Sequence, residues 1–137
     1  MEPTLNFIGL IHSSLKILEE CPLQENENSP SATLEIFSSF KEGIKDLKEC
    51  MDILLLTWLH IADRSILKCR PRQNTEGNYI GVFSTRSPDR PNPIGIHFVK
   101  VESIMSDGRI KISGLEVLDQ TPLLDIKPMW NISIQVT

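Results

Sequence analysis

Cysteine is scarce in this chain, and the few cysteines present are poorly placed to build a site. Cys21, Cys50 and Cys69 are widely separated, and none belongs to a Cys-x-x-Cys pair. A disulfide framework needs an even set of cysteines, and structural zinc sites usually draw on closely spaced cysteines or histidines. Since the three histidines are also far apart, we expect reduced thiols and no metal site.

Long hydrophobic runs are also missing. The longest apolar stretch, Ile53–Ile61, contains a threonine and a histidine, and it is far shorter than the ~20 residues that cross a bilayer. The first 20 residues hold three glutamates and lack the cationic start and apolar core of a signal peptide. Because 137 residues is the length of one domain, we expect a single cytoplasmic domain over residues 1–137 that does not enter a membrane.

Positive charge is in short supply, which argues against a nucleic-acid surface spread over the whole chain. The net charge is −4, and residues 1–63 hold four basic against eleven acidic residues. Residues 64–90, here called the basic island, instead hold six basic residues against two acidic ones. Such an island is compatible with a local phosphate-binding surface and equally with a solvated loop, and charge alone does not separate the two.

Helical patterns are rare, whereas short strand patterns are common. The best helical candidate is Phe40–Cys50, where Ile44 and Leu47 lie among charged residues. Ile94–Ile104 alternates regularly, and Ser106-Asp107-Gly108 after it is typical of a hairpin turn. Further strands are expected at Leu5–His12, Ala32–Phe37, Met51–Ile61, Ser65–Cys69, Tyr79–Phe83, Arg109–Ser113, Glu116–Leu118 and Ile132–Val136, with a loop over Cys21–Ser31. Many short strands with one helix predict an all-β barrel or sandwich rather than a doubly wound sheet.

Residues 81–95 form the first of two segments with distinctive polar chemistry. They read Gly-Val-Phe-Ser-Thr-Arg-Ser-Pro-Asp-Arg-Pro-Asn-Pro-Ile-Gly, and the three prolines exclude a helix or a central strand. Each proline also pushes the preceding residue toward an extended backbone. We therefore expect a stiff loop between two strands. It either presents its polar side chains to a ligand or is a rigid surface turn without one, and the composition does not decide between these.

Residues 119–128 form the second segment and read Asp-Gln-Thr-Pro-Leu-Leu-Asp-Ile-Lys-Pro. Asp125 and Lys127 are two residues apart, so in a strand both side chains lie on the same face. An exposed ion pair of this kind stabilises a protein very little. Taken alone, the segment indicates no particular chemistry.

Taken together, the two segments resemble a known family. GVFSTRSPDRPNPIG is similar to the GVFATRSPxRPNPIG signature of the TrmO family, also called TsaA-like or YaeB-like proteins. DQTPLLDIKP is similar to that family's DGTPxLDIKP. The opening strand Ile8–Ser13 and the apolar run Leu55–His60 are similar more loosely. The resemblance extends from the opening strand to Pro128.

The resemblance implies a fold and an activity. The implied fold is an up-and-down β-barrel of about seven strands with one or two short helices, which agrees with the strand pattern. The implied protein is a homodimer that binds S-adenosyl-L-methionine near the subunit interface. The implied reaction is N6-methylation of an adenosine next to the tRNA anticodon, often one that already carries a threonylcarbamoyl group.

The resemblance also implies a set of cofactor-binding residues. Gln120 stands where the family usually has glycine, Leu23 where it has arginine, Ile61 where it has glutamine, and Met129 where it has tyrosine. The implied set is Pro22, Leu23, Gln24, His60, Ile61, Arg86, Ile96, Asp119, Gln120, Thr121 and Pro122.

Catalysis and RNA binding lead to a second set of candidates. Holding the acceptor nitrogen against the methyl group supplies most of the acceleration of methyl transfer, but an adenine N6 must also lose a proton. Asp119 and Asp89 are the candidate acceptors by their place in the two segments, although each could simply cap a turn. We expect His12 and His97 to be structural, and the RNA phosphates to contact Arg70, Arg72 and Arg90.

Two alternatives to this activity stay open at this point. The departures at Gln120 and Met129 suggest a protein that binds S-adenosyl-L-methionine but has lost catalysis. The acidic remainder of the chain suggests an enzyme that methylates a different acceptor, either a small metabolite or another RNA.

Overall fold

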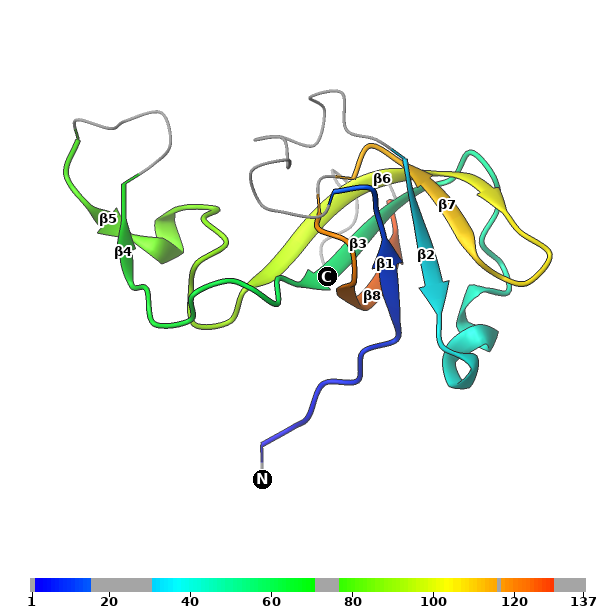
Figure 1. The fold of residues 1–137 in the computed structure, drawn as a ribbon, viewed down its shortest axis with the longest axis horizontal. Helices are drawn as coiled ribbons and strands as arrows, with labels where there is room; N and C mark the ends of the chain where they lie inside the picture. The colour runs from blue at the N-terminus through cyan, green and yellow to red at the C-terminus, as the bar shows by residue number, and fades with distance from the viewer. Residues whose placement is uncertain (1, 16–30, 71–76, 116, 130–137) are drawn as a thin grey trace.

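The computed structural model describes residues 2–15, 31–70, 77–115 and 117–129. Six strands form a closed barrel in the order β1-β2-β7-β6-β3-β8, and two more form a separate small sheet, β4-β5 (Figure 1). This confirms the predicted all-β barrel. The strands are β1 Gly9–His12, β2 Ala32–Ile36, β3 Asp52–Trp58, β4 Lys68–Cys69, β5 Ile80–Gly81, β6 Ile94–Ile104, β7 Ile110–Ser113 and β8 Thr121–Pro128. The 3-10 helices are η2 Ser38–Ile44 and η3 Val82–Ser84.

The alternation of apolar side chains along the strands creates the core. In β2 and β3 every second residue is buried, which is the period of a strand with one face turned inward. Leu34, Ile53, Leu55 and Val101 are fully buried in this interior. The core therefore fills the barrel, and the predicted boundaries of the best alternating segment, Ile94–Ile104, are confirmed by β6.

The outward face of β6 is unusual because it is also apolar. Ile94, Ile96 and Phe98 are 43%, 45% and 48% exposed, although they alternate with buried residues. Their partners on β3 are equally apolar: Trp58 pairs with Ile94, Leu56 with Ile96 and Leu54 with Phe98. We call these six residues the β3–β6 outer face.

Several boundaries predicted from the sequence are wrong. The expected helix Phe40–Cys50 is instead a 3-10 helix that begins at Ser38 and ends at Ile44, followed by turns. Its apolar side chains lie against the barrel, with Phe40, Ile44 and Leu47 packed on the core. This packing is partial, because no residue of η2 is fully buried.

The strand predictions also need correction at both ends of the chain. β1 is shorter than Leu5–His12, and Val117 and Leu118 form no strand. β8 was not predicted as a strand because it contains two prolines. Pro122 pairs only with Leu10 of β1, and Pro128 pairs only with Ile53 of β3, so at each proline one side of the strand needs no ladder hydrogen bond. The predicted loop Cys21–Ser31 lies outside the described residues except for Ser31. The predicted strand Ile132–Val136 lies wholly outside them.

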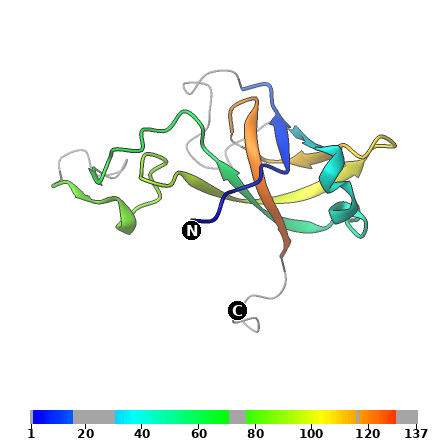
Figure 2. The same ribbon diagram turned by 90° about the horizontal axis from the view of Figure 1, so that it is seen from below.

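Residues 61–70 and 77–93 extend away from the barrel as an arm that carries β4, β5 and η3. Both ribbon views show it to one side of the barrel (Figures 1 and 2). β4 is only Lys68–Cys69 and β5 only Ile80–Gly81, each much shorter than predicted. In the part of the chain that the structure describes, no helix is long and apolar enough to cross a membrane.

Candidate functional site

The strand register brings the two distinctive segments to the same end of the barrel. Trp58, the last residue of β3, pairs with Ile94, and Thr57 pairs with Leu123 near the start of β8. Ile11, near the end of β1, pairs with Thr121. The ends of β1 and β3 and the starts of β6 and β8 therefore lie together. We call this end, with residues 59–64, 82–93 and 119–122, the motif end.

Arg90 holds the proline-rich loop in shape. Its guanidinium donates hydrogen bonds to the backbone oxygens of Ser87, Val82 and Thr85, the first two at 2.7 and 3.0 Å. A planar guanidinium with several donors suits such convergent carbonyls. The Thr85 hydroxyl adds a 2.8 Å bond to the oxygen of Val82. The predicted stiff loop is thus stiff for two reasons, its prolines and this arginine.

A ladder of hydrogen bonds joins this loop to the chain that follows β3. The Leu59 amide donates to the oxygen of Pro93 at 2.8 Å, and the Asp63 amide donates to the Asp89 carboxylate at 2.8 Å. Arg64 donates to the oxygen of Pro91 at 2.7 Å. His60 and Ile61, which lie between these bonds, are therefore held beside the loop.

The Asp63 carboxylate organises the outer part of the same ladder. It accepts hydrogen bonds from the Ser65 hydroxyl at 2.6 Å and the Ser65 amide at 2.9 Å. The bond from the Ser65 hydroxyl has the larger effect and that from the amide the smaller, and together they hold the pKa of Asp63 below its usual value. Asp63 therefore fixes a turn and stays ionised over the physiological range.

The turn before β8 is anchored to β1. The Asp119 carboxylate accepts a hydrogen bond from the Ser13 amide at 2.9 Å, while the amides of Asp119 and Gln120 donate to the oxygens of Leu15 and Ile11, both at 2.7 Å. Gln120 has a φ of 69°, in the left-handed region that favours glycine. The family's usual glycine at this position is thus explained by the backbone.

The barrel interior near the motif end contains a polar pair. The Thr57 hydroxyl and His97 Nε2 are 2.9 Å apart and both side chains are buried. A Cβ on Gly95 would meet these same atoms at 2.5 and 2.7 Å. The glycine that closes the PNPIG segment therefore makes room for this hydrogen bond. The expectation that His97 is structural agrees with its position.

His12 makes contacts that the sequence did not predict. His12 Nε2 lies 2.6 Å from a Glu35 carboxylate oxygen, and His12 Nδ1 lies 3.1 Å from the Gln120 amide nitrogen. His12 ends β1, Glu35 lies on β2, and Gln120 lies in the turn before β8. No short-range sequence pattern links residues 23 and 108 positions apart, so only the barrel closure reveals this chain of contacts.

The motif end brings together most of the predicted cofactor-binding residues. Asp119, Gln120, Thr121 and Pro122 form the turn and the start of β8, with Thr121 and Pro122 buried. His60, Ile61, Arg86 and Ile96 are exposed. Within the described residues, Arg86 has no hydrogen bond or ion pair. Pro22, Leu23, Gln24 and Arg72 lie outside the described residues.

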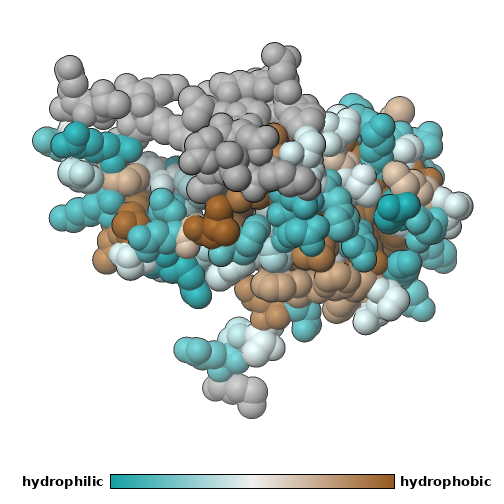
Figure 3. All heavy atoms as spheres, viewed as in Figure 1, coloured by the Kyte–Doolittle hydropathy of each residue, from teal (hydrophilic) through white to brown (hydrophobic). Residues whose placement is uncertain are grey.

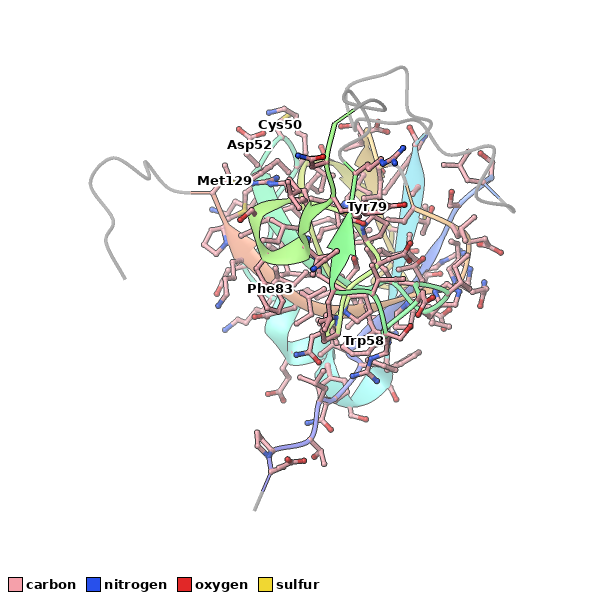
Figure 4. The ribbon with its side chains drawn as sticks, turned by 90° about the vertical axis from the view of Figure 1, so that its left-hand side faces the viewer. Cys50, Asp52, Trp58, Tyr79, Phe83 and Met129 are labelled. Atoms are coloured by element: carbon pink, nitrogen blue, oxygen red, sulfur yellow. The ribbon has the colours of Figure 1, made fainter. Side chains whose placement is uncertain are left out.

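The arm presents aromatic rings beside arginines. The Arg70 guanidinium lies 4.9 Å from the centre of the Tyr79 ring, and the Arg64 guanidinium lies 5.0 Å from that of Trp58. Tyr79 is 61% and Phe83 79% exposed. Figure 4, which faces this side of the molecule, shows both rings on the arm and Trp58 below them. Figure 3 shows hydrophobic patches on the arm and where it joins the barrel.

A cavity with a volume of about 690 Å³ lies on the outside of β2. Its lining includes His12, Glu35, Lys41, Asp107 and Arg109. None of the predicted cofactor-binding residues lines it. Among the described residues no three histidine, cysteine or acidic side chains gather as metal ligands do.

The sequence and the fold are similar to those of known proteins. Residues 10–133 match the model of the tRNA-methyltransferase O N-terminal domain. A probable S-adenosyl-L-methionine-binding protein of Archaeoglobus fulgidus is 42% identical over 90% of this chain and 33% of its own length. A protein of the same description from Methanothermobacter thermautotrophicus is 34% identical over 95% of this chain and 92% of its own length.

A solved structure shows the same fold. A crystal structure of TrmO from Pseudomonas aeruginosa superposes with a TM-score of 0.76 at 32% identity, covering 99% of this chain and 60% of that one. The chain thus spans a third of the Archaeoglobus relative and about three fifths of the solved structure. The family model covers nearly the whole chain, and we conclude that the chain belongs to the tRNA-methyltransferase O N-terminal domain family.

Proposed function

We propose that this protein is an S-adenosyl-L-methionine-dependent methyltransferase that methylates N6 of the adenosine next to the tRNA anticodon, including adenosine that carries threonylcarbamoyl. The observation that carries the proposal is the meeting of both family segments at one barrel end, in a chain that matches the family model over residues 10–133. The relatives named for S-adenosyl-L-methionine binding support the cofactor. A cytoplasmic location follows from this activity.

The chemistry of the motif end fits this cofactor. S-adenosyl-L-methionine carries a carboxylate, an adenine ring and a sulfonium whose methyl group is transferred. Arg86 offers an exposed guanidinium that the described part of the chain does not use, and such a group binds carboxylates well. Ile96 offers an exposed apolar surface, and the Asp119 turn supplies polar backbone and side-chain groups beside it.

A second copy of the chain completes the proposed site. The β3–β6 outer face runs along the barrel to the motif end and includes Ile96. An apolar face that extends over two neighbouring strands is typical of a protein interface rather than of a monomer surface. We infer a symmetric homodimer, the commonest oligomer, in which this face is covered and Ile96 lies at its edge beside the cofactor.

The arm is the proposed RNA surface. Arg70 is exposed there, and the rings of Tyr79 and Phe83 give unpaired bases a surface for stacking. Arg90 was also expected to contact phosphate, but its donors bind backbone oxygens, so Arg70 is the better candidate. Binding to phosphates there should weaken steeply as salt rises.

Incubation with S-adenosyl-L-methionine and total tRNA, followed by nucleoside mass spectrometry, tests the proposal. We expect a methyl group on N6 of the anticodon-adjacent adenosine. Cofactor binding without any methylated product would favour the binding protein that lacks catalysis. Methylation of another nucleoside, or of a small metabolite only, would favour the enzyme with a different acceptor. Either result contradicts the proposed reaction.

A further inference from the structure

We propose that His12 accepts the proton that the acceptor nitrogen loses during the proposed methyl transfer, with Glu35 as its positioning residue. This inference rests on the proposed function. It comes from a chain of contacts in which a carboxylate, an imidazole and the side-chain amide of Gln120 follow one another at the motif end.

The contacts fix the form of the imidazole. The amide nitrogen of Gln120 can only donate, so His12 Nδ1, 3.1 Å away, is the acceptor. The ring hydrogen is therefore on Nε2, where it is donated to Glu35 at 2.6 Å. A carboxylate that holds one ring nitrogen of a histidine both orients the ring and stabilises the imidazolium formed when the other nitrogen takes a proton.

His12 is also accessible to an acceptor. Its side chain is 40% exposed and Glu35 is 45% exposed. The ring contacts Gln120 of the cofactor turn and also lines the 690 Å³ cavity. An incoming N–H can therefore replace the Gln120 amide at Nδ1. Among the described residues, the charged groups that contact the ring or its partner Gln120 are Glu35 from β2 and Asp119 from the turn. Lys41, Asp107 and Arg109 line the same cavity.

The two aspartates predicted for this role are less suited to it. One oxygen of Asp119 accepts a hydrogen bond from the Ser13 amide, and one oxygen of Asp89 accepts one from the Asp63 amide. Both carboxylates therefore fix backbone, as turn-capping aspartates do. An imidazole is in addition the type of side chain that proteins use most often as a general base.

The step balances without any further reactant. The acceptor N–H donates to His12 Nδ1. The lone pair of the acceptor nitrogen forms the new nitrogen–carbon bond, and the electron pair of the broken carbon–sulfur bond stays on sulfur. The proton passes to the lone pair of His12 Nδ1, and the electron pair of the broken N–H bond stays on the acceptor nitrogen. Glu35 faces the resulting imidazolium at Nε2. The proton then leaves to solvent through the exposed ring.

The first test examines the free protein. Nitrogen-15 NMR of the histidine rings should show His12 with its hydrogen on Nε2, and Glu35→Gln should give a mixture of the two tautomers. A hydrogen on Nδ1 in the wild type overturns the inference. This readout does not depend on cofactor, RNA or activity.

The second test measures methyl transfer to tRNA. His12→Ala should lower kcat by about 10²- to 10⁴-fold, should remove the acidic limb of the pH–rate profile, and should be partly rescued by free imidazole. Affinity for S-adenosyl-L-methionine should not change. Glu35→Gln should lower kcat by less. The matched control is Asp52→Asn, which removes a carboxylate paired with Lys100 at the opposite end of β3, and it should keep the full rate.

The outcomes separate the two proposals. An active wild type with an equally active His12→Ala, or a loss that imidazole does not restore, overturns the role of His12 and leaves the proposed function standing. A wild type that binds S-adenosyl-L-methionine but methylates no tRNA overturns the proposed function and the role of His12 together.

Discussion

At the scale of single residues, close packing in the barrel requires two glycines, one in the opening strand and one in the first segment. A Cβ on Gly95 would displace the buried Thr57–His97 hydrogen bond. A Cβ on Gly9 would clash with the backbone oxygen of Glu35 on the neighbouring strand, whereas one on Gly43 meets nothing. The close approach of two strands therefore requires Gly9, and the hydrogen bond inside the barrel requires Gly95.

Gln120 shows the opposite case, a side chain where the backbone favours glycine. Its φ of 69° costs a residue other than glycine about 1 kcal/mol or more. We predict that Gln120→Gly raises the free energy of unfolding by about 1 kcal/mol, measured by chemical denaturation.

The control for this prediction is Gln120→Ala, which removes the same side chain but keeps a Cβ in the left-handed conformation. It should give no gain in stability. A Gln120→Gly protein no more stable than the alanine variant would show that the turn relaxes and that the backbone is not strained there.

At the scale of elements, the sequence predicted what local patterns encode. Regular alternation identified Ile94–Ile104 with its true ends, and the Ser-Asp-Gly turn after it is confirmed by a glycine at φ 90°. The predicted helix was wrong in type and in bounds, since Ser38–Ile44 is a 3-10 helix whose Phe40 and Ile44 pack on the barrel. β8 was not predicted, since prolines disfavour a central strand. Only the closed barrel shows that each proline pairs with a residue of one neighbouring strand.

The site was predictable in part for the same reason. The two segments identified the motif end, and the register of the strands brings them together. The roles of Arg90 and His12 were not predictable, because both depend on contacts made by the folded loop and the closed barrel. The sequence made Arg90 a candidate for phosphate contact, and the fold adds hydrogen bonds from its guanidinium to the loop backbone.

The loop prediction concerns Arg90. Arg90→Lys removes the guanidinium group that donates hydrogen bonds to three backbone oxygens. A lysine ammonium can reach fewer of these oxygens. Hydrogen exchange at the amides of Thr85, Ser87 and Asp89 should accelerate by about tenfold or more, since hydrogen bonds to a charged group contribute about 1.5–3 kcal/mol. Exchange in β3 should stay unchanged.

Arg86→Lys is the matched control, because Arg86 lies in the same loop and is exposed without a partner in the described part of the chain. It should leave the exchange of all three amides unaltered. Equal acceleration in both variants would contradict the view that Arg90 specifically orders the loop.

At the scale of the whole molecule, the β3–β6 outer face leads to a prediction about assembly. We expect light scattering to give twice the 15.5 kDa mass of one chain at micromolar concentration. Phe98→Glu should convert the dimer to a monomer, because it buries a charge in an apolar interface. Lys111→Glu, which adds negative charge on the outward side of β7, should remain dimeric. A wild-type monomer would contradict the covered face.

The central claim is that the motif end binds S-adenosyl-L-methionine, and its most direct test is a calorimetric titration. We predict saturable binding that S-adenosylhomocysteine competes for. Arg86→Ala should weaken this binding by about ten- to a hundredfold, the equivalent of a charge-assisted hydrogen bond of about 1.5–3 kcal/mol. Lys100 is an exposed cation that pairs with Asp52 at the far end of β3. The Lys100→Ala variant should bind S-adenosyl-L-methionine with the affinity of the wild type. No heat and no competition, or equal affinity in the wild type and Arg86→Ala, would contradict the account.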